Sequence, residues 1–368
     1  MTAIHFVSDC PRIIHGYNFG NVLSPIPQIS PYIGKNNGHV HITITLTWTI
    51  LQNNRLELLA NEYFKYKRKY PNIIVTILAN EPKELDALRS KNIRSCLCSH
   101  NAFLDEHLYT INSEKQKKYD AVINSRMSPY KRIELARDIK NSCLITYFLD
   151  PSDQDYARTI VPYVTEDGRG VCKNMNFPQY QNGQWKWLSR EDVNDIYAQS
   201  RCGVILSPYE GACFASAEYL LCGLPVVTTA SIGGRDEFFD KDYVIYTDPD
   251  PKSVAEAVDK ALALTISPEE IRNRTIEKMH AMRSNYCDML NNIAKEEGMD
   301  INFHEKWGDF FINKMLNNYP GGLENELREA LKNAGLRVSF PVIHRLHLYH
   351  KLFKEWLRKY KFKYKILR

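Results

Sequence analysis

Short apolar runs alternate with amphipathic segments along most of the chain, and this pattern predicts an α/β protein. The apolar runs are typical of buried strands and occupy residues 39–49, 72–78, 95–103, 120–126, 142–149, 203–206, 224–227 and 244–246. Helical spacing of apolar positions marks the segments 55–70, 81–90, 189–200 and 250–264, with a further helix from Ser267. Strands that alternate with helices in this way imply parallel sheets. Residues 1–38 show no clear periodicity, so we expect a surface segment there, either before a first domain or woven into it.

The chain has 368 residues, which is enough for two domains and a tail. We predict a first unit over residues 1–115, a second over 116–290 and a helical C-terminal segment over 291–368.

One stretch of the second unit, VILSPYEGACFASAEYLLCGLPVVTT at residues 204–229, combines a strand, a tight turn and a helix. Ser207-Pro208 ends the strand, and small residues then begin a helix that we expect to stop at Cys222-Gly223. Free backbone N–H groups and the positive end of the helix dipole make such a helix start an anion site. The turn is therefore the first candidate binding site.

Two carboxylates, Glu210 and Glu218, bracket this turn with seven residues between them. Glu-x7-Glu followed by a Gly-x-Pro-Val-Val strand resembles the nucleotide-sugar site of family 4 glycosyltransferases. The resemblance extends from about residue 120 to 264, although Tyr219 stands where the family usually has Ala.

This resemblance implies the GT-B fold, in which two Rossmann-like domains face each other across a cleft. It also implies that Glu210 contacts the donor sugar and that Glu218 holds the ribose of the nucleotide. Four residues of the turn are predicted to bind the nucleotide-sugar as well: Gly211, Ala212, Cys213 and Phe214.

Arg126 and Lys131 are candidates for gripping the diphosphate. Arg126 ends a predicted strand, and Lys131 lies in the first turn of a helix that we expect Ser128 to cap and Pro129 to begin. This is where α/β sheets bind phosphate, and the Arg-x4-Lys spacing resembles the family's phosphate clamp. The alternative interpretation is a surface pair on an ordinary loop.

His100 is the first-unit candidate for the catalytic face, since a histidine of the first domain often lies near the donor in relatives. It could equally be an ordinary loop histidine. Residues 166–188, which include two tryptophans, are expected to line the pocket for the base.

No metal or cofactor is expected beyond the nucleoside-diphosphate-sugar itself. Asp-x-Asp, a metal signature of another glycosyltransferase fold, occurs at Asp153-x-Asp155 and at Asp248-x-Asp250. Asp250 precedes Pro251 and is explained as a helix cap, whereas we place Asp153 and Asp155 in a polar loop. The nine scattered cysteines indicate reduced thiols of a cytoplasmic protein.

The net charge of +5 is concentrated in the tail, because residues 344–368 contain nine Lys or Arg and one Glu. Apolar residues recur there at spacings of three and four, which predicts an amphipathic helix with a basic face. Such a helix can bind an anionic membrane surface, so we expect attachment to the inner face of the membrane. Alternatively, its stripe packs on the protein itself. No window is long and apolar enough for a transmembrane helix.

The predicted function is transfer of a sugar, with retention, from a nucleoside-diphosphate-sugar to a surface glycan or a lipid-linked saccharide. Two alternatives stay open: a nucleotide-sugar 2-epimerase of the same fold, and a nucleic-acid-binding protein that uses the basic tail.

Overall fold

The computed structural model describes residues 2–18, 22–30, 38–148, 151–160, 164–165, 172–175, 180–181, 184–185 and 188–311. The predicted basic helix at 344–368 lies outside these residues.

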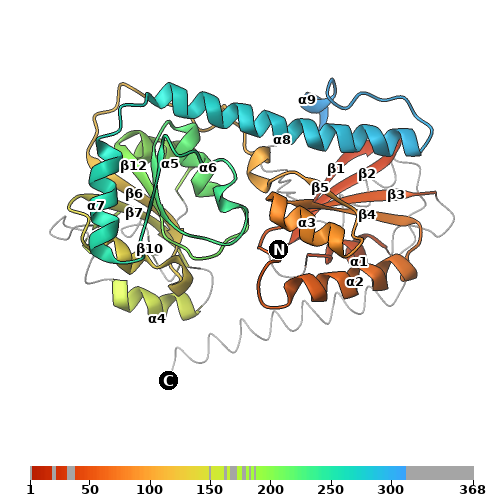
Figure 1. Ribbon diagram of the computed structural model, residues 1–368, viewed down its shortest axis with the longest axis horizontal. Helices are drawn as coiled ribbons and strands as arrows, with labels where there is room; N and C mark the ends of the chain where they lie inside the picture. Colours follow the sequence, from red (N-terminus) through yellow and green to blue (C-terminus); the bar gives the residue numbers. More distant parts are fainter. Residues whose placement is uncertain are drawn as a thin grey trace.

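The first unit contains a five-stranded sheet in the order β1-β2-β3-β4-β5 (Figure 1). Its strands are β1 (Thr2–Asp9), β2 (Arg12–Asn18), β3 (Val40–Thr45), β4 (Ile73–Ala79) and β5 (Ser95–Leu97). β1 and β2 form an antiparallel hairpin, and the pairs from β2 to β5 are parallel.

The hairpin corrects the prediction of a surface segment over residues 1–38. Its hydrophobic pattern is hidden because histidines occupy buried positions in both strands. His15 is fully buried, and its two ring nitrogens lie 3.0 and 3.1 Å from the hydroxyls of Thr43 and Thr45 on β3. His15 can occupy a core position because its polar atoms have partners on β3. An apolar residue at this position would have made the strand recognisable in the sequence.

The helices of the first unit are α1 (Pro25–Ile29), α2 (Arg55–Lys69) and α3 (Pro82–Ser90). The prediction for residues 95–103 is a strand that enters a loop at Ser99. The strand β5 ends at Leu97, and a 3₁₀ turn, η2, occupies His100–Phe103. Ser99 caps this turn by accepting a hydrogen bond from the backbone N–H of Asn101.

The second unit contains a seven-stranded, entirely parallel sheet in the order β14-β13-β12-β6-β7-β9-β8. Its strands are β6 (Tyr119–Arg126), β7 (Ser142–Tyr147), β8 (Val164–Thr165), β9 (Cys172–Asn174), β12 (Ser200–Ile205), β13 (Val226–Thr229) and β14 (Val244–Thr247). β10 (Tyr180–Gln181) and β11 (Gln184–Trp185) form a separate hairpin.

The helical elements of this unit are η3 (Pro129–Lys131), η4 (Ile133–Ala136), α4 (Pro151–Ile160), α5 (Arg190–Ala198), α6 (Phe214–Leu221), η7 (Gly234–Asp236) and α7 (Pro251–Leu262). Ser189 and Asp250 cap α5 and α7 as predicted.

Two local predictions for this unit are wrong. The helix expected after Ser128 is only the 3₁₀ turn η3, which Ser128 does not cap and which Arg132 ends in a left-handed conformation, with φ of 49°. Asp153 and Asp155 lie in α4 rather than in a polar loop.

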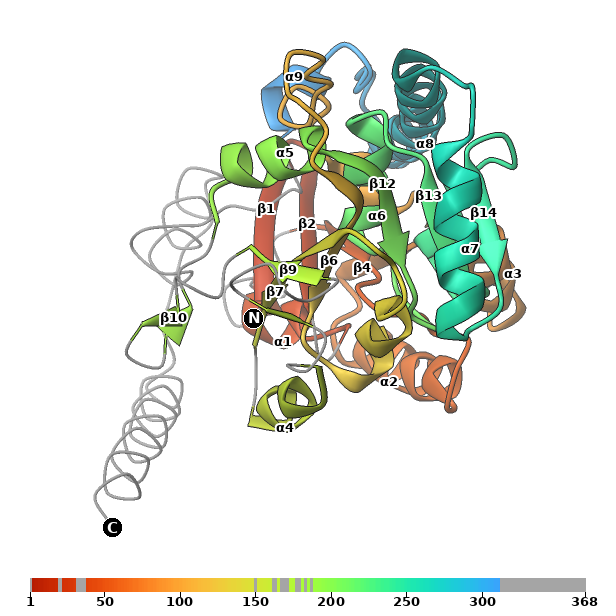
Figure 2. The ribbon, with the colours of Figure 1, turned by 90° about the vertical axis from the view of Figure 1, so that its left-hand side faces the viewer.

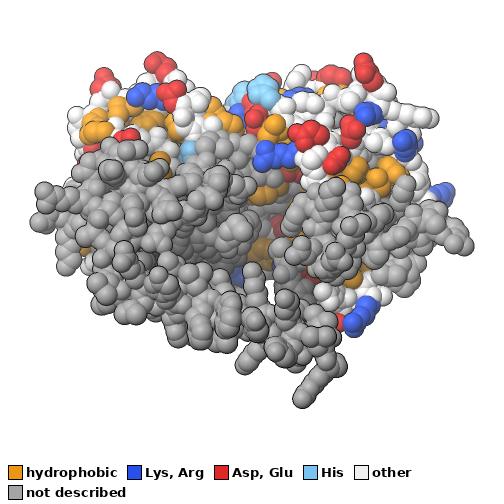
Figure 3. All heavy atoms as spheres, turned by 180° about the vertical axis from the view of Figure 1, so that it is seen from behind, with side chains coloured by type: hydrophobic (Ala, Val, Ile, Leu, Met, Phe, Trp, Pro, Cys, Tyr) orange, Lys and Arg blue, Asp and Glu red, His pale blue; other side chains and the backbone are white. Residues whose placement is uncertain are grey.

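A long helix, α8 (Pro268–Glu296), runs along one edge of both units and is followed by α9 (Trp307–Phe310) (Figure 1). Two of its arginines fasten the segment that connects the units: Arg283 donates to the carbonyls of Ala102 and Leu104, and Arg272 donates to that of Tyr109. Viewed from behind, acidic and basic side chains are interspersed along this edge (Figure 3). No helix among the described residues is both long enough and apolar enough to cross a bilayer.

Helices cover the sheets in both units, and α7 lies beside β14 in the second (Figure 2). Buried apolar residues on the two faces of each sheet form the cores, and one cluster extends from the first unit through α8 into the second. The prediction of an α/β chain with two Rossmann-like units facing across a cleft, the GT-B arrangement, is confirmed. The exact boundaries 1–115, 116–290 and 291–368 stay a prediction.

Candidate active site

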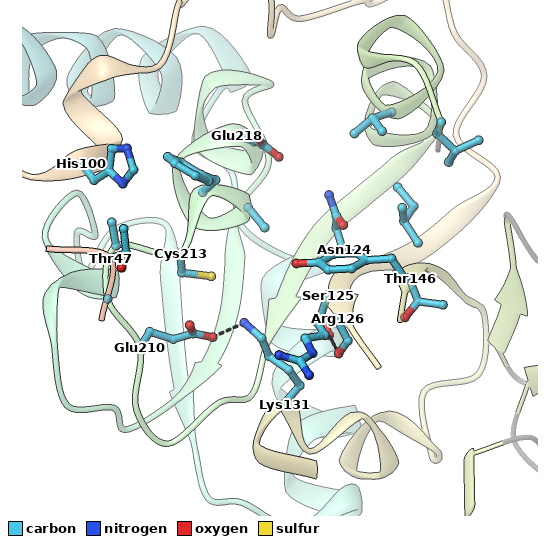
Figure 4. A pocket seen from close by; sticks show the side chains of 18 of the residues that line it. Thr47, His100, Asn124, Ser125, Arg126, Lys131, Thr146, Glu210, Cys213 and Glu218 are labelled. Atoms are coloured by element: carbon cyan, nitrogen blue, oxygen red, sulfur yellow. Dashed lines mark hydrogen bonds and ion pairs between the residues drawn. The ribbon is translucent and has the colours of Figure 1, made fainter. Parts of the chain in front are cut away.

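A pocket of about 470 Å³ lies between the two units (Figure 4). Thr47, Trp48 and His100 line it from the first unit. The second unit lines it with the ends of β6 and β7, the turn η3, residues 210–215 and Glu218. These segments follow the carboxyl ends of parallel strands, where open α/β sheets bind their ligands. The volume is in the range of small-molecule sites.

Glu210 and Lys131 form an ion pair inside this pocket, where both side chains are nearly buried (Figure 4). Arg132 positions the lysine, because its guanidinium donates to the carbonyl of Leu206 and to the hydroxyl of Thr229 and so ties η3 to the ends of β12 and β13. Burial lowers the pKa of Lys131, but the charge of Glu210 more than offsets this, and the pKa lies above its ordinary value. Lys131 is therefore a cation at neutral pH.

Glu218 lies one helical turn into α6, and tyrosines surround its carboxylate. The hydroxyl of Tyr197 donates to Oε2 of Glu218 over 2.9 Å. Burial, and next the charge of Glu218, raise the pKa of Tyr109 well above its usual range. Both phenols thus stay protonated, and Tyr197 holds the carboxylate as an acceptor facing the pocket.

Tyr219, where the family usually has Ala, supports this arrangement. Its hydroxyl accepts a hydrogen bond from the backbone N–H of Asn124 on β6, and the side-chain amide of Asn124 donates to Tyr197. The ring of Tyr219 lies over Gly203 of β12, where an added Cβ would be only 2.2 Å from it. The large residue is therefore accommodated by a glycine on the neighbouring strand.

The turn before α6 is held against the first unit. The amide of Asn101 donates to the carbonyls of Ala212 and Cys213 over 2.7 and 3.3 Å. A Cβ on Gly211 would lie 2.5 Å from the carbonyl oxygen of Thr47, so only glycine fits this close approach. Burial, and next the charge of Glu210, raise the pKa of the Cys213 thiol to about 12, which keeps it neutral.

Arg126, at the end of β6, also lines the pocket, and Asp153 holds it there. Nε of Arg126 donates to Oδ2 of Asp153 over 2.8 Å, and this aspartate is fully buried. Because the carboxylate of Asp153 accepts the hydrogen bond from Nε, it fixes the orientation of the guanidinium plane of Arg126.

His100 begins the turn η2 and is buried at the first-unit side of the pocket. Its backbone N–H donates to the side chain of Asn80 over 2.9 Å. Its ring packs edge-on against Phe214, with centroids 4.7 Å apart.

All nine side chains and turn residues predicted from the sequence line this one pocket: His100, Arg126, Lys131, Glu210, Gly211, Ala212, Cys213, Phe214 and Glu218. Their individual roles stay predictions. The segment 166–188 lies largely outside the described residues, but Leu188 at its end does line the pocket.

Other residues of the site escaped the sequence analysis, among them Thr47, Trp48, Tyr109, Asn124, Tyr130 and Asp153. Thr47 and Trp48 could have been found, because they follow a strand at its carboxyl end. Asp153 could not, because its role depends on contact with a residue 27 positions away.

Neither Asp-x-Asp pair belongs to a group of three or more His, Cys, Asp or Glu whose potential ligand atoms lie close together among the described residues. Asp153 pairs with Arg126, and Asp250 accepts a hydrogen bond from the backbone N–H of Ser253 at the start of α7.

Parts of this chain are similar in sequence to known proteins. Residues 184–278 match the family model described as Glycosyl transferases group 1. Two curated proteins, each named as one component of phosphatidylinositol N-acetylglucosaminyltransferase, match shorter segments. The one from Arabidopsis thaliana is 40% identical over 67 residues, which are 18% of this chain and 15% of that protein. The human one is 33% identical over 91 residues, which are 23% of this chain and 19% of that protein.

Solved structures with a similar arrangement include Alr3699/HepE from Anabaena in complex with UDP, with 15% identity, a TM-score of 0.49 and coverage of 69% of this chain and 72% of that one. Another is sucrose-phosphate synthase from Thermosynechococcus elongatus, with 16% identity, a TM-score of 0.46 and coverage of 74% and 68%. The segments matched in the curated relatives span less than a fifth of either relative's length. Over residues 184–278, which contain Glu210, Glu218 and α6, this chain is similar to the group 1 glycosyltransferases, in agreement with the resemblance predicted from its sequence.

Proposed function

We propose that this protein is a retaining glycosyltransferase that moves a hexose-type sugar from a nucleoside-diphosphate-sugar to a glycan or lipid-linked saccharide. The observation that carries this proposal is the single pocket that brings together two carboxylates, two cations and a helix start between two α/β units. The family match over residues 184–278 supports it.

In this proposal the donor lies along the pocket with its nucleotide towards Glu218 and its sugar towards Glu210. Glu218 accepts hydrogen bonds from the hydroxyls of the ribose, and Glu210 accepts hydrogen bonds from the hydroxyls of the donor sugar. The diphosphate lies between them, close to Lys131, Arg126 and the N-terminus of α6.

Transfer breaks the bond between the anomeric carbon and a phosphate oxygen, and the electron pair remains on the departing diphosphate. The acceptor hydroxyl forms the new bond to the anomeric carbon, and its proton passes to an oxygen of the departing diphosphate. Positive groups that face the developing charge lower the barrier for this step. Lys131 retains two further N–H donors besides the one directed to Glu210, and these suit a phosphate.

Because Lys131 and Arg126 supply this positive charge, we propose that transfer does not require a metal. Activity should persist in EDTA. A complete loss that Mg²⁺ or Mn²⁺ restores would contradict this part of the proposal.

The acceptor is proposed to be a surface glycan, as in polysaccharide or lipopolysaccharide biosynthesis, or a lipid-linked saccharide. The two curated relatives are named for transfer to phosphatidylinositol, which supports the lipid branch. The basic segment 344–368 would bring the enzyme to the inner face of the membrane. Sedimentation with anionic and neutral vesicles, with and without residues 344–368, tests this attachment.

The test of the activity is a panel of UDP-, GDP-, dTDP- and CMP-sugars. A donor should raise the melting temperature, because it binds only the folded state. It should release nucleoside diphosphate only when an acceptor is added. Donor turnover without an acceptor would favour the 2-epimerase alternative. Salt-sensitive retention of nucleic acid without any nucleotide-sugar binding would favour the nucleic-acid-binding alternative.

A further inference from the structure

Two histidines and a glutamate converge at the end of β3 that is remote from the pocket. His39 directly precedes β3 and His41 lies within it, whereas Glu297 is the C-cap residue of α8. Nδ1 of His39 and Nε2 of His41 lie 2.8 and 2.9 Å from the same oxygen, Oε1 of Glu297. In Figure 1 the C-terminal end of α8 lies above the five-stranded sheet.

These three side chains have the geometry of a ligand set. One potential ligand atom from each lies within 4.8 Å of the others, and no other group of three or more His, Cys, Asp or Glu in the described part of the chain meets this condition. The side chain of His41 is only 1% exposed. Its Nδ1 is buried and has no hydrogen-bond partner among the described residues, so Nε2 makes the one polar contact of this ring that the structure shows.

We propose that His39, His41 and Glu297 bind Zn²⁺ or a similar divalent ion such as Co²⁺ or Ni²⁺. Two imidazoles and a carboxylate are typical ligands of these ions, whereas Mg²⁺ and Ca²⁺ prefer oxygen ligands only. His39 is 53% exposed, which gives the ion a path to the site and leaves room for water as a further ligand.

The ion fits after a small adjustment. Zinc bonds of about 2.0–2.1 Å in tetrahedral geometry place ligand atoms ~3.3 Å apart. The two histidine nitrogens must therefore each move away from Oε1 by roughly half an ångström. The exposed side chain of His39 and the half-buried side chain of Glu297 allow this. Nearby, Arg94 is neutralised by Glu296 through two hydrogen bonds of 2.9 Å, so the arginine opposes a bound cation only weakly.

Such an ion would fasten the end of α8 to the first sheet and would not take part in transfer. The six residues of β3 separate the site from Thr47 and Trp48 of the pocket, a distance of ~20 Å. The proposal is therefore independent of the proposed glycosyl transfer.

The test uses the full-length chain, freed of metal with a chelator and titrated with Co²⁺ and then Zn²⁺. Visible absorption of bound Co²⁺ reports nitrogen and oxygen ligation, and isothermal titration gives the affinity. The variants are His39→Ala, which changes an exposed side chain, and Glu297→Gln. His304→Ala is the matched control, since the one carboxylate that His304 pairs with among the described residues is that of Asp288, at 2.8 Å.

We expect the wild-type protein to bind one such ion and to melt at a higher temperature with it. His39→Ala and Glu297→Gln should weaken binding by more than about tenfold and abolish the rise in melting temperature, whereas His304→Ala should change neither. The proposal is overturned if the wild type binds neither Co²⁺ nor Zn²⁺ at an ion concentration of about 100 µM. It is also overturned if both variants bind the ion as tightly as the control, because the ion then lies elsewhere.

Discussion

The ammonium of Lys131 and the carboxylate of Glu210 form a buried ion pair in the pocket, although they lie 79 positions apart in the sequence. The two residues belong to different parts of the predicted site, one for the phosphates and one for the sugar. In the structure each compensates the charge of the other. The pocket therefore contains a negatively charged side chain that can accept hydrogen bonds from hydroxyls and a positively charged one that can bind phosphate. A nucleoside-diphosphate-sugar carries both kinds of group.

Removal of Lys131 alone should destabilise the protein. Lys131→Met leaves the Glu210 carboxylate buried without its partner and should lower the free energy of unfolding by about 3–5 kcal/mol. The double variant Lys131→Met, Glu210→Gln should recover most of this loss. Urea unfolding of both variants measures the difference. Lys252→Met is the control, because Lys252 forms an exposed pair with Glu256, and such a pair should contribute less than about 1 kcal/mol. Equal stability of the wild type and the single variant would contradict the buried pair.

Tyr197 should affect nucleotide affinity through Glu218. Tyr197→Phe removes the hydroxyl that orients the carboxylate, so the nucleoside diphosphate should bind about 3- to 10-fold more weakly, with a smaller change in the turnover rate at saturating donor. Tyr63→Phe is the matched control, because the hydroxyl of Tyr63 is also buried but bonds the carbonyl of Val75 within the first unit. Isothermal titration measures the nucleotide affinity of both variants. An equal loss of affinity in Tyr197→Phe and Tyr63→Phe would contradict the specific role of Tyr197 and indicate a general effect of lost stability.

The two aspartates of one Asp-x-Asp pair should behave differently. Asp153→Asn loosens Arg126 and should lower kcat/KM for transfer, whereas Asp155→Asn should not, because Asp155 is 76% exposed and pairs with Arg158. Combining Asp153→Asn with Arg126→Ala should add little to the effect of Arg126→Ala, since both changes act on one contact. Equal effects of the two aspartate changes, reversed by added Mg²⁺ or Mn²⁺, would support a metal at this motif instead.

Stability should fall as the pH rises through the range in which Glu237 ionises. Burial, and next the charge of Glu81 from the first unit, raise the pKa of Glu237 to about 7. The folded protein therefore holds a proton that the unfolded chain has lost, and its stability decreases between the ordinary pKa of 4.5 and about 7. Glu237→Gln removes this contribution, so the variant should gain stability relative to the wild type from pH 5 to pH 8. Urea unfolding at both pH values tests this, with the exposed Glu277→Gln as control. A difference in stability between the variant and the wild type that is the same at pH 5 and pH 8 would refute it.

The sequence predicts those parts of the fold and site that depend on local order. The turn at 207–213 and its helix could be predicted because a strand, small residues and Gly223 follow one another directly. Gly223 does adopt a positive φ of 72° after α6, as a helix stop requires. The nine candidate residues meet in one pocket because parallel strands bring their carboxyl ends to the same edge of a sheet.

Features that depend on distant contacts could not be predicted. The β1–β2 hairpin is hidden because His15 takes a core position and finds its partners on β3. The contact between Asp153 and Arg126 joins the first turn of α4 to the carboxyl end of β6, and no local pattern in the sequence indicates it. Arg272 and Arg283 join α8 to the segment between the units by donating to backbone carbonyls of residues 102–109, more than 160 positions earlier in the chain.

The most direct test of this account is titration of the wild type, Glu210→Gln and Glu218→Gln with free nucleoside diphosphates, together with their turnover of the matching donor. Glu218→Gln should weaken nucleotide binding by at least about tenfold, since a hydrogen bond to a charged group contributes about 1.5–3 kcal/mol. Glu210→Gln should bind the free nucleotide within about twofold of the wild type, a difference of roughly 0.4 kcal/mol, and lose most of its turnover. Unchanged nucleotide affinity in both variants, with normal turnover in either, would contradict the proposed placement of the donor.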